Sequence, residues 1–326
     1  MIVQLAMNRK TNPIHNISRR DFITLGGVAA IGVSLMPRSL FASAESPVIA
    51  IRKAAATARI TVIKLRGNIS VLEGSGGNIA VLTGRDGKLL VDTGIPATRA
   101  RITDALDTLS GDPVKHLINT HWHFDHTDGN EWLHSIGAEI TAHENTRKHL
   151  AETTRVEDWD FTFPPAPAGA LPTKVFTKDE TLHLNGATLE LKCYEPAHTD
   201  SDISVDFTAA DILHCADTFW NGYYPFIDYS TGGSIDGMIR AAEANVARAT
   251  DKTIVIPGHG PIGNKSQLIE FRDMLVSVRE KVSALKKKGR SLDEVLAAKP
   301  TGDHDAKWGG FVIDGKNFTG LVYQGV

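Results

Sequence analysis

The chain has 326 residues, of which 42% are hydrophobic and 22% are charged, and its formal net charge is −3. This length and composition fit a globular protein with a sizeable core, and the sequence has no repeat, coiled-coil pattern or long polar tract that would indicate a fibrous or disordered chain. The acidic balance disfavours nucleic acid as a partner, because binding to a phosphate backbone requires a basic surface.

Residues 1–44 are predicted to form an export signal that is removed from the mature protein. Arg19 and Arg20 precede an uncharged run of 15 residues, 22–36, which is too short and too rich in glycine and alanine to favour a membrane span. Followed by the small residues of 42–44, this order resembles a twin-arginine signal with an A-x-A cleavage site. We therefore expect a periplasmic or secreted protein that begins near Glu45, engages the export machinery and keeps no permanent membrane anchor.

Residues 45–326 are expected to form a single domain, which is more acidic than the whole chain. Removal of the signal takes away five of the 35 basic residues and one of the 38 acidic residues, so the formal net charge changes from −3 to −7. A domain of this charge is a poor match for nucleic acid.

Short strands and one helix are expected in the first half of this domain. The strand-like runs are 60–64, 69–73, 78–83, 88–92 and 114–118. The Arg-Asp-Gly sequence of 85–87 indicates a tight hairpin turn between the third and fourth runs. Pro96 is expected to open a helix with an apolar face that extends from Ile102 to Leu109.

Strands alternate with helices in the second half. The expected strands are 189–194, 203–207, 212–216 and 253–256, and the expected helices are 235–249 and 267–287. Ser291 and Glu294 resemble a capping box that begins one more helix. Two β-rich halves with helices outside them predict an α/β sandwich.

The densest cluster of chemically active side chains directly follows the strand-like run 114–118. His121, His123, Asp125 and His126 place three imidazoles and a carboxylate within six positions. Imidazole and carboxylate ligands together suit divalent ions such as zinc, iron or manganese. In an extended backbone the first two histidines project to the same side and can hold one ion. The other two ligands face a different direction and would serve a second ion about 3.5–4 Å away.

This H-x-H-x-D-H pattern after a strand resembles the hallmark of the metallo-β-lactamase-fold hydrolases. Four other elements of that family occur in the expected order between Asn68 and Gly260. One of them contains Asp92, which the resemblance implies orients the metal-binding segment without binding metal. The resemblance also implies an αβ/βα four-layer sandwich with the site at the strand ends, and seven metal ligands: His121, His123, Asp125, His126, His198, Asp217 and His259.

The resemblance implies a catalytic domain that holds two divalent metal ions, with zinc expected and iron or manganese as alternatives. His121, His123 and His198 would hold one ion, and Asp125, His126 and His259 the other, with Asp217 as the bridge. A metal-bridging hydroxide would then attack an ester, lactone, thioester or amide-like bond of a small-molecule substrate, since a bound ion lowers the pKa of water from 15.7 to about 7. Of the seven ligands, Asp125 and Asp217 are the expected catalytic residues.

Two other activities stay open for this fold. A β-lactamase is one, although the best-known drug-resistance subclass has cysteine where Asp217 stands. A mononuclear iron oxygenase acting on sulfur is the other, with His121, His198 and Asp217 as its ligands. Retention of His126 and His259 favours two metals instead, and a non-catalytic binding protein would be expected to have lost ligands.

The two cysteines, Cys193 and Cys215, are too few for a four-thiolate metal site. Both fall in apolar runs, which favours buried free thiols, and whether they pair stays open. Cys215 stands two residues before Asp217 and would point to the same side of an extended strand. Metal ligation by this cysteine is not expected, because the set of histidines and aspartates is complete.

Two segments are expected to face the substrate. The segment 161–172 contains four prolines, so it is predicted to be a loop. The aromatic segment 219–226 begins two residues after Asp217. It is interpreted either as ordinary packing or as a pocket wall for an apolar or aromatic group of the substrate.

Overall fold

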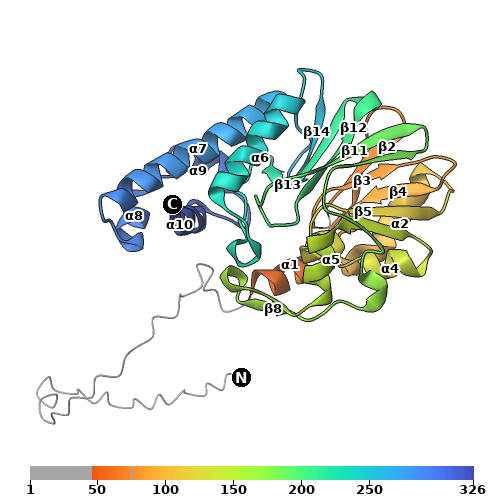
Figure 1. The fold of residues 1–326 in the computed structure, drawn as a ribbon, viewed down its shortest axis with the longest axis horizontal. Helices are drawn as coiled ribbons and strands as arrows, with labels where there is room; N and C mark the ends of the chain where they lie inside the picture. The colour runs from red at the N-terminus through yellow and green to blue at the C-terminus, as the bar shows by residue number, and fades with distance from the viewer. Residues whose placement is uncertain (1–45, 75) are drawn as a thin grey trace, which may run out of the picture. The chain divides into compact units, whose positions relative to one another are not determined.

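The two β-rich halves expected from the sequence are two sheets that face each other, with helices on their outer sides (Figure 1). The protein is represented by a computed structural model, which describes residues 46–74 and 76–326 within one compact unit. The predicted export signal, 1–44, lies outside the described residues.

The first sheet has seven strands in the order β1-β2-β3-β4-β5-β6-β9. Their bounds are β1 (Thr61–Lys64), β2 (Ile69–Glu73), β3 (Ile79–Leu82), β4 (Lys88–Val91), β5 (Val114–Asn119), β6 (Glu139–His143) and β9 (Lys174–Phe176). The pairs from β1 to β4 are antiparallel, and β4, β5, β6 and β9 run parallel. The hairpin predicted between β3 and β4 is therefore confirmed.

The second sheet has five strands in the order β10-β11-β12-β13-β14. Their bounds are β10 (Glu180–Leu184), β11 (Ala187–Cys193), β12 (Ile203–Phe207), β13 (Ile212–Trp220) and β14 (Ile254–His259). The pairs from β10 to β13 are antiparallel, whereas β13 and β14 are parallel. Both β13 and β14 extend beyond their predicted ends, so each reaches a predicted metal ligand, Asp217 in β13 and His259 in β14.

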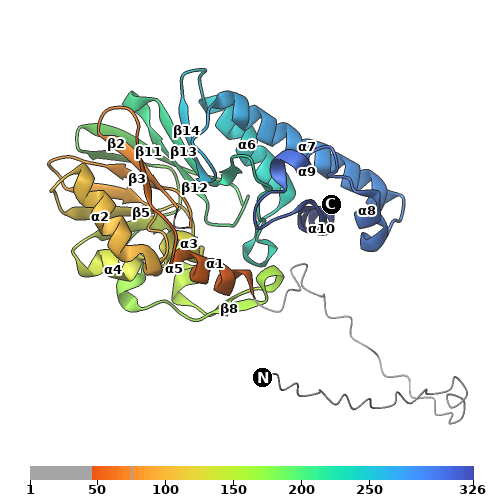
Figure 2. The same cartoon turned by 180° about the vertical axis from the view of Figure 1, so that it is seen from behind.

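Helices cover the outer face of each sheet (Figure 2). The first sheet is covered by α2 (Arg99–Leu109) and α4 (Asn130–Ser135), and the second by α6 (Ile235–Arg248) and α7 (Lys265–Lys287). The other helices are α1 (Pro47–Ala55), α3 (Phe124–Thr127), α5 (Glu144–Ala151), α8 (Leu292–Ala298), α9 (Asp305–Trp308) and α10 (Gly315–Gly325). The capping box predicted at Ser291 and Glu294 begins α8.

Three hydrophobic clusters hold these layers together. Because side chains alternate along a strand, Val71 of β2 belongs to the cluster between the two sheets, while its neighbour Leu72 packs in the cluster with α2. The third cluster lies between the second sheet and its helices and contains Phe219, Met238 and Phe271. This succession of helix, sheet, sheet and helix confirms the αβ/βα sandwich.

Two local expectations are corrected. Pro96 opens a short 3-10 turn, Pro96–Thr98, and α2 follows it. The segment 161–172 is not wholly a loop, because β8 (Phe161–Phe163) pairs with β7 (Thr154–Val156) in a small separate sheet. The aromatic and β-branched residues of β8 precede the first proline of the segment, so the argument from proline content applies only after Phe163.

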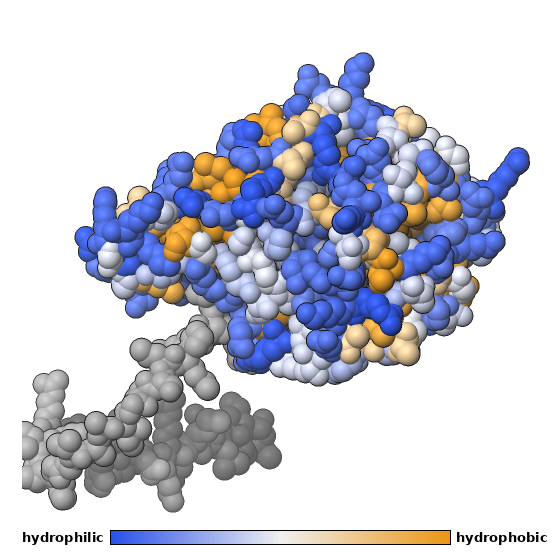
Figure 3. Space-filling model, in the orientation of Figure 1, coloured by the Kyte–Doolittle hydropathy of each residue, from blue (hydrophilic) through white to orange (hydrophobic). Residues whose placement is uncertain are grey.

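The outer surface is mainly hydrophilic on the face that carries α6 and α7, and apolar side chains form small separate patches there (Figure 3). Within the described ranges, the structure contains no helix whose length and apolar character would let it cross a bilayer.

We expect Phe271→Ala to lower the free energy of unfolding by about 3–5 kcal/mol, because it removes a fully buried ring from the cluster beneath α7. That ring contacts Phe219 and Trp308, with centroids 5.3 Å and 5.8 Å away. Chemical denaturation measures the effect. Ile136→Ala serves as the control, since Ile136 is 49% exposed and its truncation should change stability by about 0.5 kcal/mol or less. Equal effects of the two substitutions would contradict the assignment of this core.

Candidate metal centre

A change of backbone direction after β5 separates the four ligands of the sequence motif into two pairs. His121 and His123 leave the strand end in a non-helical segment, and His123 is the residue before α3. Asp125 and His126 lie within α3, whose first turn is closed by the hydrogen bond from His126 N to His123 O, 3.0 Å long. The two pairs therefore present their side chains in different directions, as the spacing predicts.

The other three predicted ligands come from the second sheet. His198 lies on the loop between β11 and β12, Asp217 lies within β13, and His259 is the last residue of β14. A glycine allows the close approach of β13 and β14 here. A Cβ atom on Gly258 would lie 1.9 Å from Asp217 Oδ1, so any larger residue would displace that carboxylate.

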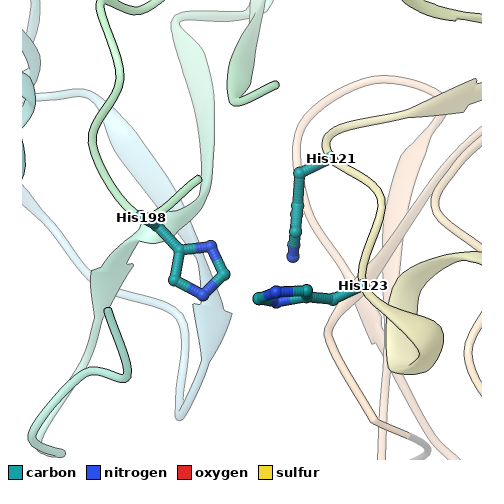
Figure 4. Close-up of side chains that lie close together, drawn as sticks. All are labelled: His121, His123 and His198. Atoms are coloured by element: carbon teal, nitrogen blue, oxygen red, sulfur yellow. The ribbon is translucent and has the colours of Figure 1, made fainter. Parts of the chain in front are cut away.

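The structure brings all seven predicted ligands together. Three groups have ligand atoms that lie within 4.8 Å of one another: His121, His123 and His198; His121, His126 and Asp217; and Asp125, His126 and His259. Figure 4 shows the rings of the first group converging from two segments of the chain.

Asp217 occupies the middle of the cluster. Its Oδ1 lies 3.1 Å from His126 Nε2, and its Oδ2 lies 3.3 Å from His259 Nε2 and 3.6 Å from His198 Nε2. Asp125 Oδ2 lies 3.4 Å from the same nitrogen, His259 Nε2. One carboxylate thus contacts rings from both of the ion sites expected from the sequence.

Several buried atoms of the cluster lack a hydrogen-bond partner in the described part of the chain. They include His121 Nε2, His126 Nε2, both ring nitrogens of His198 and Asp217 Oδ1. A buried polar atom left without a partner costs about 1–3 kcal/mol, and folded proteins contain few of them. His198 Nδ1 lies 3.5 Å from Asp202 Oδ1, and the other four atoms are directed into one small space. They fit a bound cation, since neutral imidazole nitrogens and carboxylate oxygens are metal ligands. The residues present therefore fit a metal site.

The far side of each ring is held by a hydrogen bond that fixes which nitrogen faces the cluster. His121 Nδ1 lies 3.0 Å from Thr120 Oγ1, and His126 Nδ1 lies 2.8 Å from Asp92 Oδ2. Both pairs leave Nε2 for a metal ion. In His123 the two ring nitrogens exchange these parts: Nε2 lies 3.0 Å from Asp228 Oδ2, and Nδ1 is the nitrogen left for a metal ion.

Asp92 holds the metal-binding segment in place as well as one ring. Its Oδ1 accepts a hydrogen bond of 2.8 Å from Thr120 N, and its Oδ2 accepts one of 2.7 Å from Thr120 Oγ1. Asp92 has a positive φ of 67° and follows β4, so a strained residue at the end of one strand fixes the loop after the neighbouring strand. This position agrees with the orienting role that the resemblance to the family implies for Asp92.

Asp228 is a residue that the sequence analysis missed. It is fully buried, and in addition to His123 it binds the backbone of Ser230 and the hydroxyl of Thr231. Nothing in the motif pointed to it, because it lies 105 positions away from the ring that it orients. Asp202 fixes the loop that carries another ligand: its Oδ2 accepts hydrogen bonds of 2.7 Å and 2.8 Å from the backbone of His198 and Thr199.

The electrostatic balance of the cluster favours positive charge beside Asp217. Burial lowers the pKa of His121 and His123 and keeps these imidazoles neutral. Burial opposes charge on His126 as well, but Asp217 and Asp125 outweigh it and raise the pKa of His126 well above its usual value. Burial would raise the pKa of Asp217, yet the surrounding rings, with His259 contributing most, hold it well below its usual range. A carboxylate that stays ionised here is a ready metal ligand.

The expectation that Cys215 shares the side of Asp217 is wrong. Ala216 between them has a positive φ of 48°, and the pairing of β13 with β14 shifts register there, so the alternation of an extended strand is interrupted. Cys215 instead packs in the hydrophobic cluster with α6 and α7, where burial raises the pKa of its thiol to about 12. Cys193 and Cys215 are both free thiols.

A cavity of about 460 Å³ opens onto the cluster. Trp220 and Phe226 from the aromatic segment line it, while Phe219 and Tyr224 are buried in the core, so each of the two interpretations of that segment holds for different residues. No residue of 161–172 lines this cavity directly. Phe163 instead packs against two rings that do, Phe124 and Trp159, with centroids 5.9 Å and 6.2 Å away.

We expect Asp228→Asn to weaken metal binding by about 10–100-fold, because the neutral amide holds the His123 ring less firmly and removes a buried charge that supports it. Competition with a chromophoric chelator measures the affinity. Asp236→Asn is the control, since Asp236 pairs with Arg279 on the surface and contacts none of the rings. Equal affinities of wild type and Asp228→Asn would show that this hydrogen bond does not orient a ligand.

Residues 72–260 match the family described as Metallo-beta-lactamase superfamily. Hydroxyacylglutathione hydrolase from Polaromonas sp. is 29% identical over 174 residues, which make up 52% of this chain and 58% of that enzyme, so the match spans less than two thirds of that relative's length.

Solved structures share the fold. The sec-alkylsulfatase Pisa1 from Pseudomonas sp. superposes with a TM-score of 0.61 at 18% identity, over 81% of this chain and 50% of that one. A metallo-beta-lactamase from Pontibacter korlensis gives 0.55 at 21% identity, over 67% of this chain and 99% of that one. Since the family match covers more than half of the sequence, this chain belongs to the metallo-beta-lactamase superfamily.

Proposed function

We propose that this protein is an exported, dinuclear metal-dependent hydrolase of an ester, lactone, thioester or amide-like bond in a small molecule. The observation that carries this proposal is the convergence of seven buried histidine and aspartate side chains, four of which, His121, His126, His198 and Asp217, have buried atoms that make no hydrogen bond in the described part of the chain. Membership of a superfamily that contains a hydroxyacylglutathione hydrolase supports the hydrolytic reaction.

The geometry supports two ion sites in this proposal. His121, His123 and His198 form one group, and a separate group consists of Asp125, His126 and His259. Asp217 lies between them and contacts rings of both groups, which suits a bridging carboxylate. The ligand set of imidazole and carboxylate favours zinc, with iron or manganese as alternatives.

When bound, divalent ions supply an activated water at neutral pH and polarise the carbonyl oxygen of a substrate. The protein's own residues provide position and proton transfer. Asp217 is almost fully buried and ionised, so it is assigned to holding the ions. Asp125 is 8% exposed and lines the cavity, so its carboxylate oxygens can orient the nucleophile or pass a proton to the leaving group.

The alternatives make different demands on the same residues. A mononuclear iron oxygenase needs only His121, His198 and Asp217 as metal ligands. The group of Asp125, His126 and His259 would then bind no metal. Iron content together with oxygen uptake would reveal that activity. A β-lactamase remains a candidate within the hydrolase class, and turnover of a β-lactam in a substrate panel tests it.

The dinuclear proposal predicts two metal ions per chain in the reconstituted wild type. His121→Ala should empty the first site and His259→Ala the second, each leaving about one ion. Asp217→Asn keeps the volume but removes the charge, so turnover should fall by roughly 10²-fold or more and the second ion should bind more weakly. Metal analysis by mass spectrometry, turnover and circular dichroism are measured on each variant.

Asp206→Asn is the matched control for that series. Asp206 lies on β12, the neighbour of β13, but it belongs to none of the three ligand groups. It should keep wild-type metal content and turnover. A wild type that never holds more than one tightly bound ion, or an Asp217→Asn variant with native turnover and two ions, would defeat the dinuclear assignment.

Export is supported by the order of sequence features in residues 1–44. Changing Arg19 and Arg20 to lysine preserves their charge but removes the paired arginines, so the precursor should accumulate in the cytoplasm. Cell fractionation followed by mass analysis of the amino terminus measures this, with Arg9→Lys and Lys10→Arg as charge-conserving controls. Processing of the double variant at wild-type level would refute the twin-arginine assignment.

A further inference from the structure

The cavity above the ligand cluster has a polar floor and apolar walls. The floor consists of His123, Asp125, His198, Asp217 and His259, all of which belong to the ligand groups. The walls are formed by small apolar, aliphatic and aromatic residues, among them Ile51, Ala54, Ile95, Trp159, Trp220 and Phe226. Among the described lining residues, the only ionisable side chains are those of the floor.

Two wall segments come from opposite ends of the domain. Helix α1 contributes Ala50, Ile51 and Ala54, and the segment 311–313, between α9 and α10, contributes Phe, Val and Ile. Both segments lie outside residues 72–260, the part that matches the superfamily. The ligand cluster thus lies within the region that matches the family, and part of the wall of this cavity, called the chamber below, comes from segments outside that region.

Helix α1 is fixed over the site by polar contacts at its two ends. Ser46 Oγ donates a 2.8 Å hydrogen bond to Trp159 O, and Arg101 Nη2 donates one of 2.9 Å to Ala55 O. Arg52 of this helix forms an ion pair of 2.8 Å with Asp128 and stacks on the lining residue Phe124 with 5.1 Å to the ring centroid. Its charge is neutralised outside the chamber and is not available to an anionic arm of a substrate. Helix α1 lies close to α3, as Figure 2 shows and the contact between Arg52 and Phe124 confirms.

The mouth of the chamber is apolar as well. Phe311 and Val312 line the cavity and yet are 46% and 39% exposed. Phe311 packs against Tyr223 and Trp220, with centroids 4.8 Å and 6.1 Å away. Large apolar side chains that are exposed to solvent around a cavity indicate a binding site for an apolar ligand, because the bound ligand would remove them from water.

We propose, on the basis of the hydrolase function above, that the substrate is an ester-type compound whose scissile carbonyl carries an uncharged hydrocarbon arm, and that this arm fills the chamber beneath α1 and residues 311–313. Hydrolysis adds water across the acyl C–O bond and releases the carboxylic acid of the arm and the alcohol. A charged arm is disfavoured, because the walls offer no counter-charge and burial of an unpaired ion is costly. Each methylene buried contributes about 0.8 kcal/mol, which is about fourfold in binding.

The first test compares p-nitrophenyl esters on the metal-loaded mature protein. Octanoate should exceed butyrate in kcat/KM by up to roughly 10²-fold, since four more methylenes are buried. The mono-p-nitrophenyl ester of suberic acid has the same chain length but ends in a carboxylate, and it should be hydrolysed at least about tenfold less efficiently than octanoate. Equal values for octanoate and the suberate ester, or for octanoate and butyrate, would overturn the proposal.

The second test changes the wall. Ala54 is exposed on α1 and lines the cavity, and lysine is well tolerated in helices. Ala54→Lys should lower the ratio of octanoate to suberate-ester hydrolysis by about tenfold, because the ammonium group gives the carboxylate a partner. Ala54→Met adds similar bulk without charge and should keep the ratio within about threefold of wild type. An unchanged ratio in Ala54→Lys would place the arm elsewhere and contradict the proposal.

A binding measurement separates failure of this inference from failure of the hydrolase function. Octanamide and 8-amino-8-oxooctanoic acid have the same length, and only the second ends in a carboxylate. Calorimetric titration of the metal-free protein should show at least about tenfold tighter binding of octanamide, with the preference reduced in Ala54→Lys. If no ester is hydrolysed but octanamide binds selectively, the proposed reaction is wrong and the assignment of the chamber to an uncharged hydrocarbon chain is supported. If esters are hydrolysed and neither amide is preferred, the chamber assignment is wrong.

Discussion

The carboxylate of Asp217 is the group on which the arrangement of the site depends. It is almost fully buried between rings that come from both halves of the sandwich, His126 from the first and His198 and His259 from the second. Without a cation, the cluster would bury several unpartnered polar atoms at once, each at a cost of about 1–3 kcal/mol. A metal ion held there would satisfy those atoms and would join the two sheets, so metal binding and packing of the halves stabilise each other.

The close packing around this carboxylate restricts the backbone. Gly258 lets β14 pass beside Asp217. Gly77, which lies just before β3, lets its own segment pass beside His126, where a Cβ atom would lie 2.1 Å from the ring. Ala216 adopts a left-handed conformation that turns Asp217 into the cluster and leaves Cys215 in the core. Such strained or crowded positions are retained where the surrounding structure fixes them, and here they serve the geometry of the ligands.

Local patterns in the sequence predicted the strands β1–β5 and β11–β14, the helices α2, α6, α7 and α8, and the first four ligands, because each depends on alternation, periodicity or short spacing after a strand. The remaining three ligands, His198, Asp217 and His259, were implied by the resemblance to the family. Contacts between distant segments could not be predicted in that way. Asp228 reaches His123 across 105 positions, and nothing in its own neighbourhood marks it. Cys215 was placed on the wrong side because the alternation rule assumes an extended backbone, which Ala216 interrupts. The wall formed by α1 depends on tertiary packing, which a helix pattern does not reveal.

The ligand cluster lies within the region that matches the superfamily, whereas part of the chamber wall lies outside it, and this difference has a chemical reason. Activation of water and stabilisation of developing charge require the same ligands whatever the substrate, so those residues lie within 72–260, the region that matches the superfamily. The remainder of a substrate touches only the walls, and these come in part from α1 and from residues 311–313, beyond that region. Relatives can therefore share the reacting centre and differ in what they bind, which is why fold and ligands establish a class of reaction, while the composition of the walls indicates the substrate.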